Sequence, residues 1–177
     1  MGEHGDLMLT SADGTRFGAY YAHPAEGSDT AIVVLPDVRG LHTFYQELAV
    51  RFAEAGLHAV AIDYFGRTAE QLNRDESFPF RDHVEKTQTA TIAEDVAAAV
   101  AWLRLQPGVR SVFTVGFCFG GSNSWAQSAA GHDVSGCIGF YGVPSRVSDL
   151  VPLMRVPLLM LAAGEDFTPV EAVTALA

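Results

Sequence analysis

The stretch Val115-Gly116-Phe117-Cys118-Phe119-Gly120-Gly121 decides how the rest of the chain is interpreted. It joins a predicted strand at residues 111–115 to a predicted helix at residues 122–130. Its pattern is glycine, any residue, nucleophile, any residue, glycine, with a cysteine at the nucleophile position. A nucleophile in so tight a turn leaves no room for side chains two residues before it and two residues after it, and the two glycines meet that need. The stretch therefore predicts a strand, turn and helix that present the Cys118 thiol.

The surroundings of Cys118 favour chemistry at this thiol. A helix that follows the turn directs its first backbone N–H groups and its dipole at the site, which stabilises a thiolate and a developing oxyanion. The alternative is a core cysteine in a glycine-rich turn, because cysteine is often buried. The strand before the turn and the helix after it favour the catalytic interpretation. The other cysteine, Cys137, lies on a predicted strand and is expected to pack in the core.

The segments on either side of this turn alternate between strands and helices. The expected strands are residues 7–10, 17–22, 31–35, 58–62, 111–115, 136–141 and 158–162. The expected helices are residues 91–105, residues 122–130 and a segment that Thr43 caps and Gly56 ends. Residues 67–85 are polar and irregular. The alternation predicts right-handed crossovers, a mostly parallel sheet and one α/β domain over residues 1–177.

Composition excludes several classes of function. The net charge is -10, from 11 Lys+Arg against 21 Asp+Glu, so binding of nucleic acid or of an anionic membrane is not expected. No apolar run reaches the roughly 18 residues that span a bilayer. No cluster has the spacing of metal ligands, and no cofactor motif is present, so neither a metal nor a cofactor is expected. A thiol used in chemistry fits the reducing cytoplasm.

Four stretches resemble the dienelactone hydrolase family of the α/β-hydrolase superfamily. Residues 116–121 (GFCFGG) are similar to the family's G-[FY]-C-x-G-G turn. Residues 34–40 (VLPDVRG), 140–142 (FYG) and 164–169 (GEDFTP) are similar to three further family segments. The resemblance runs from about residue 7 to the end of the chain. It implies a three-layer α/β-hydrolase fold and cleavage of a small-molecule ester or lactone through an acyl-enzyme on Cys118, as in a carboxymethylenebutenolidase.

The resemblance also implies roles for individual residues. Asp166 matches the triad acid that orients a catalytic imidazole, although an aspartate there also suits a helix cap. Asp37 matches a glutamate that helps to activate the thiol, but it is one methylene shorter and also suits a turn. The backbone N–H groups of Val38 and Phe119 match the oxyanion hole. Arg81 matches an arginine that binds a substrate carboxylate, and a solvated surface arginine is the alternative.

The triad histidine is the missing part of this pattern. The chain has six histidines, His4, His23, His42, His58, His83 and His132. All precede Asp166, whereas the superfamily's catalytic histidine follows the acid. We therefore expect a C-terminally incomplete domain without the usual last strand and helix, either a truncated record or a poorly active fragment. The alternatives are a pseudoenzyme or binding module that keeps the pocket and, ranked last, a redox-sensing thiol. A monomer or a homodimer is expected.

Overall fold

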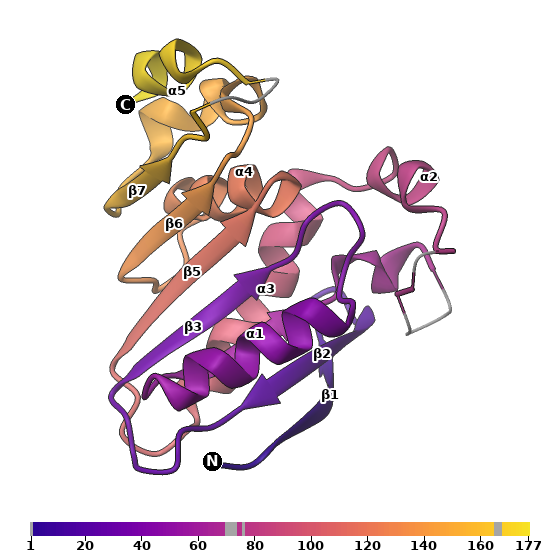
Figure 1. Cartoon of the computed structure of the whole chain (residues 1–177), viewed down its shortest axis with the longest axis vertical. Coiled ribbons are helices and arrows are strands. Elements are labelled where there is room, and N and C mark those ends of the chain that lie inside the picture. The colour runs from indigo at the N-terminus through magenta and orange to yellow at the C-terminus, as the bar shows by residue number, and fades with distance from the viewer. Residues whose placement is uncertain (1, 70–73, 76, 165–167) are drawn as a thin grey trace.

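The chain folds around one mixed sheet (Figure 1). The structure, a computed structural model, describes residues 2–69, 74, 75, 77–164 and 168–177. Within that part of the chain the strands are β1 His4–Thr10, β2 Arg16–Ala22, β3 Thr30–Leu35, β4 His58–Ile62, β5 Ser111–Phe117, β6 Gly136–Phe140 and β7 Leu158–Leu161. Their order in the sheet is β1-β2-β4-β3-β5-β6-β7. β2 is antiparallel to both β1 and β4, and all the other neighbours are parallel. The predicted α/β class is confirmed.

Helices cover both faces of this sheet. The α-helices are α1 Thr43–Glu54, α2 Phe80–Val84, α3 Thr89–Arg104, α4 Phe119–Ala126 and α5 Val170–Leu176. Short 3₁₀ helices are η1 Tyr64–Arg67, η2 Gln127–Ala129, η3 Pro144–Arg146 and η4 Ser148–Leu153. Helix α1 lies on the face opposite α3 (Figure 1). The result is the three-layer arrangement that the resemblance implied.

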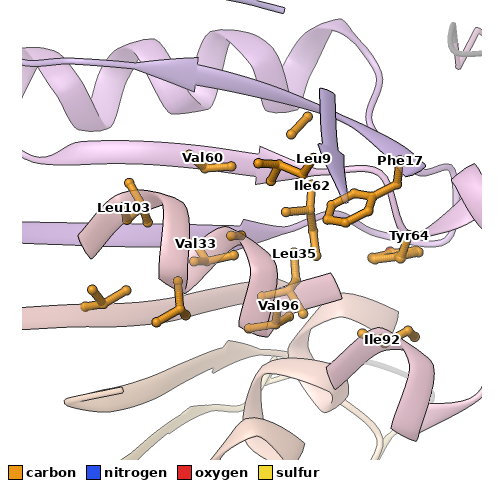
Figure 2. Close-up of a cluster of buried hydrophobic side chains, with 14 of the residues drawn as sticks. Leu9, Phe17, Val33, Leu35, Val60, Ile62, Tyr64, Ile92, Val96 and Leu103 are labelled. Atoms are coloured by element: carbon orange, nitrogen blue, oxygen red, sulfur yellow. The ribbon is translucent and has the colours of Figure 1, made fainter. Parts of the chain in front are cut away.

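Two apolar clusters hold the layers together because successive residues of a strand point to opposite faces. On β3, Val33 packs in one cluster with Val96 and Leu103 of α3 (Figure 2). Its neighbour Val34 packs in the other cluster with Ala49 of α1. Burial on both faces explains why this strand is a continuous apolar run.

One difference from the sequence prediction concerns the start of α4. We expected the helix after the glycine turn to begin near residue 121 or 122, but α4 begins at Phe119, directly after Cys118. The Cys118 carbonyl accepts the N–H groups of Gly121 at 2.9 Å and of Ser122 at 3.3 Å. The two glycines are therefore helical, and their poor helix propensity misled the prediction.

Two smaller differences lie elsewhere. His42, not Thr43, is the N-cap of α1, and its side chain makes no capping bond. The segment expected to be irregular, residues 67–85, contains α2 and the last residue of η1.

The parallel strands bring the loops of interest to one edge of the sheet. Asp37 follows β3, Tyr64 follows β4, Cys118 follows β5 and Tyr141 follows β6. In open α/β sheets, this carboxyl edge is where ligands bind. Among the described residues, no helix is both long and apolar enough to cross a membrane.

Candidate active site

Cys118 sits at the sharp bend between β5 and α4. Its φ is 56° and its ψ is -116°, a backbone conformation that residues with a side chain rarely adopt. Its N–H donates to the carbonyl of Phe140 on β6 at 3.0 Å, which fixes the bend against the neighbouring strand. The side chain is partly exposed, whereas Cys137 is buried as predicted. A partly exposed cysteine in a strained conformation at a strand–helix turn has the geometry of a nucleophile elbow.

The glycines of the elbow are required by contact distances. A Cβ added to Gly116 would lie 1.9 Å from the carbonyl oxygen of Gly120, and one added to Gly120 would lie 2.1 Å from the carbonyl oxygen of Leu35. A Cβ on Gly121 would lie 2.5 Å from the carbonyl oxygen of Phe140. No side chain fits at these separations, so the steric reason given for the pattern holds. The second contact also shows that the elbow lies directly against the end of β3.

The loop after β3 carries Asp37, whose carboxylate binds Arg39. The Arg39 backbone N–H donates to Asp37 Oδ1 at 2.8 Å, and Arg39 Nη2 donates to Oδ2 at 2.9 Å. His42 Nε2 lies 4.0 Å from Asp37 Oδ1. Burial acts to raise the pKa of Asp37, but the hydrogen bonds and charge of Arg39 outweigh it, so this pKa lies below its usual value. Asp37 is therefore an anion at neutral pH.

Two buried tyrosines hold the backbone of the same loop. Tyr45 of α1 accepts the Asp37 N–H at 3.0 Å. Tyr64 of η1 donates to the Asp37 carbonyl at 2.7 Å and also contacts the Pro36 carbonyl. Its ring packs edge-on against Phe119, with centroids 5.4 Å apart. Neither tyrosine stands out in the sequence, because a buried tyrosine gives no signal until the loop that it contacts is known.

The two expected oxyanion donors are the backbone N–H groups of Val38 and Phe119, and they differ from the neighbouring N–H groups in their hydrogen bonding. Among the described residues, the N–H groups of Val38 and Phe119 take part in no hydrogen bond of the loop or the elbow. Phe119 is the first residue of α4, where a backbone N–H has no partner within the helix. Both amides are therefore available to a ligand atom.

The structure brings only some of the predicted residues to this edge. Arg81 lies in α2 and is exposed, beside Phe78 and Pro79. Asp166 lies outside the described residues. A cavity of about 290 Å³ next to the Asp37 loop is lined by Arg39, His42, Thr43, Arg74 and Asp75.

Comparisons with known proteins agree with this geometry. The model of the dienelactone hydrolase family matches residues 17–176. A carboxymethylenebutenolidase of Pseudomonas putida is 30% identical over 171 residues, which cover 92% of this chain and 72% of that protein. Carboxymethylenebutenolidase 1 of Cupriavidus pinatubonensis is 29% identical over 173 residues, with 90% of this chain and 71% of that protein covered. A solved dienelactone hydrolase-like promiscuous phosphotriesterase from metagenomic libraries has a TM-score of 0.80 at 23% identity, covering 99% of this chain and 75% of its own.

Proposed function

The chain belongs to the dienelactone hydrolase family, and we propose that it cleaves a carboxylic ester or lactone through a thioester on Cys118. The single observation that carries the proposal is the elbow. A non-glycine residue at positive φ, closed in by glycines that no other residue can replace, presents its thiol at the carboxyl edge of the sheet. Holding a nucleophile in that conformation costs on the order of 1–3 kcal/mol, which a purely structural cysteine has no reason to incur.

The proposed reaction has two steps. The Cys118 thiolate attacks the carbonyl carbon, a C–S bond forms, and the carbonyl electrons move to oxygen. That oxyanion accepts hydrogen bonds from the N–H groups of Val38 and Phe119. In a preorganised site such bonds stabilise the transition state by several kcal/mol. The tetrahedral species then expels the alkoxide, which takes up a proton, and leaves a thioester. Water attacks the thioester, and the acid and the thiol are released.

Further residues have proposed supporting roles. Asp166 orients the base that receives the thiol proton, as its match to the family's acid suggests. Asp37, held as an anion by Arg39, takes part in activating the thiol, as its match to the family's glutamate suggests. Arg81 binds a substrate carboxylate, and its exposure leaves the guanidinium accessible.

The substrate is a small molecule, and we propose a conjugated lactone that carries a carboxylate. The names of the relatives support this, since two are carboxymethylenebutenolidases. We place the reaction in the cytoplasm, in a monomer or homodimer that binds neither nucleic acid nor membrane, because the chain is acidic and its chemistry needs a reduced thiol. A binding module without catalysis, the alternative considered from the sequence, finds no support in the comparisons.

The test compares two cysteine variants on an activated aryl ester. Cys118→Ala is expected to lower the rate of aryl alcohol release by about 10³-fold or more, because it removes the nucleophile. Cys137→Ala is the matched control: this thiol is buried in β6, so its loss is expected to change the rate less than twofold. Equal rates for the wild type and Cys118→Ala would remove the proposed function.

A further inference from the structure

Tyr64 contacts both halves of the proposed oxyanion hole. It is the first residue of η1, separated from the end of β4 by Asp63, and only 1% of its surface is exposed. Figure 2 shows it at the end of the apolar cluster that contains Phe17 and Ile62. Its hydroxyl nevertheless faces backbone rather than water, because it donates to the Asp37 carbonyl at 2.7 Å and contacts the Pro36 carbonyl.

The bonds to the Asp37 carbonyl, from the Tyr64 hydroxyl and from the Gly40 N–H at 3.0 Å, determine where the Val38 N–H points. This carbonyl and this N–H belong to one planar trans peptide, so they project from opposite sides of the same unit. Holding the oxygen against Tyr64 therefore turns the N–H away from Tyr64, toward the side where no described group accepts it. A donor on the carbonyl also polarises the peptide and strengthens the N–H as a donor.

The ring of Tyr64 contacts Phe119, which belongs to the other half of the proposed oxyanion hole. It packs edge-on against the Phe119 ring at 5.4 Å, and Phe119 supplies the second proposed amide. Arg146 covers the Phe119 ring as well, with its guanidinium carbon 5.0 Å from the ring centroid. The Cys118 charge acts on Tyr64 too: burial is the main cause that raises the pKa of Tyr64, and Cys118 adds to it. The phenol therefore stays protonated and keeps donating when Cys118 is a thiolate.

A different tyrosine holds the preceding peptide. Tyr45 accepts the Asp37 N–H at 3.0 Å, which fixes the peptide between Pro36 and Asp37. The carbonyl of the peptide that carries the Val38 N–H accepts the Tyr64 hydroxyl and also the Gly40 N–H, the latter at 3.0 Å. Among the described residues, Tyr64 provides the one side chain that donates to this peptide. Tyr64 contacts the Pro36 carbonyl of that preceding peptide as well, so its loss acts on both peptides, whereas Tyr45 is bonded to the preceding one.

We infer that Tyr64 is a positioning residue that aims the Val38 N–H and aligns it with the Phe119 N–H on the oxyanion of the proposed reaction. This inference rests on the proposed function, since it assigns a role within that same site. It concerns stabilisation of a tetrahedral oxyanion and leaves the reactivity of the thiol itself unchanged.

The test separates these two properties. The protein is allowed to react with an activated aryl ester, which passes through an oxyanion, and in parallel with iodoacetamide, which alkylates the thiolate without one. Alkylation is followed at the peptide that contains Cys118. Tyr64→Phe is expected to lower the rate of acylation by about 10- to 100-fold, as a misaligned donor does, while alkylation stays within about twofold.

Controls and contrary outcomes are as follows. Tyr21→Phe removes a hydroxyl that donates to Glu3 at 2.8 Å on the opening hairpin, and both of its rates are expected to match the wild type. If Tyr64→Phe does not fold, 4-fluorophenylalanine at position 64 takes its place, because it fills the space of the hydroxyl without donating. Unchanged acylation, or an equal loss of acylation and alkylation, would overturn the inference. If wild-type acylation does not depend on Cys118, the proposed function fails instead.

Discussion

At the scale of single residues, the site depends on backbone that only particular residues permit. Cys118 keeps a positive φ because its N–H is bound to Phe140 and its carbonyl to the first turn of α4. The surrounding structure thus over-determines a conformation that is unfavourable by itself. The glycines on either side leave no room for a side chain.

Gly120→Ala is expected to destabilise the protein. The added methyl group would lie 2.1 Å from the Leu35 carbonyl oxygen and 2.3 Å from that of Pro36, both of which are backbone atoms that cannot turn aside. We expect the free energy of unfolding, measured by urea denaturation, to fall by about 1–3 kcal/mol or more. Ester turnover falls too, because the loop after β3 is pushed away from the elbow.

Gly27→Ala is the control for this substitution. No atom lies within 4 Å of a Cβ placed there, so its unfolding free energy is expected to stay within about 0.5 kcal/mol of the wild type. Equal stability of the Gly120 and Gly27 variants would contradict the packing described for the elbow.

Sequence reasoning at this scale was strongest where the chemistry is local. The glycine pattern predicted the bend at Cys118, and the place of Cys137 on an expected strand predicted its burial. The contact of Asp37 with Arg39, and the roles of Tyr45 and Tyr64, depend on how a loop turns and on a helix distant in sequence. No spacing pattern encodes those contacts.

At the scale of elements, the segment after β4 packs against the loop that carries Asp37. Asp63 caps η1 by accepting the Phe65 N–H, and it is bound by Arg74, whose Nη2 donates at 2.6 Å. Both side chains are almost fully buried. A Cβ on Gly40 would lie 3.3 Å from Arg74 Cγ, so this ion pair also packs against the loop that carries Asp37.

Arg74→Met is expected to be strongly destabilising at neutral pH. It leaves the Asp63 carboxylate buried without its guanidinium, at a cost of about 3–5 kcal/mol. Burial already raises the pKa of Asp63 to about 6 against the opposing effect of Arg74, and losing Arg74 raises it further. The folded variant can then take up a proton on Asp63, so the loss of stability is largest above pH 7 and shrinks as the pH falls toward 5. Urea denaturation across this pH range measures both effects.

The matched control removes an exposed ion pair. Arg110 Nη2 lies 2.8 Å from Asp29 Oδ2 at the surface, so Arg110→Met is expected to cost less than about 1 kcal/mol at any of these pH values. A loss for Arg74→Met that is as small, or that grows as the pH falls, would contradict the account of the buried pair.

The elements themselves were largely predictable because their signals are periodic. Strand β4 has the predicted bounds, and β3 differs from its prediction by one residue. The predicted start of α4 was wrong, because packing against β3 and β6 overrides the low helix propensity of two glycines. Helix α2 has five residues, too few for a period to be recognised.

At the scale of the whole molecule, the fold class and the family were predictable, because alternating strands and helices and the elbow pattern agree. The effect of burial on the ionisable side chains could not be predicted from the sequence. Burial lowers the pKa of five histidines, which a sequence does not indicate: His23, His42, His58, His83 and His132. We therefore expect the protein to lose stability in mild acid.

The pair His23 and His58 makes this sensitivity testable. Their Nδ1 atoms lie 2.8 Å apart, a hydrogen bond that requires one of these nitrogens to carry no proton. Burial lowers the pKa of His58 and the charge of His23 lowers it further, while burial is the main cause at His23. The unfolded chain thus binds more protons below pH 6.5, so stability is full above that pH and declines as the pH falls.

We expect His58→Gln to be less stable than the wild type at pH 7.5 and to lose less additional stability between pH 7.5 and 5. The replacement removes one group that must stay neutral in the folded state. Unfolding free energies at both pH values give the comparison, and His4→Gln, at an exposed histidine, is the control. A decline as steep as that of the wild type would show that this pair does not cause the acid sensitivity.

The central claim is that carbonyl chemistry passes through the Cys118 sulfur. The most direct measurement is mass spectrometry of the protein quenched in acid shortly after mixing with an activated aryl ester. We predict a mass increase of one acyl group, located on the peptide that contains Cys118, removed by hydroxylamine and absent from Cys118→Ala. An acyl group on any other residue, or turnover in the absence of any covalent adduct on Cys118, would contradict the account.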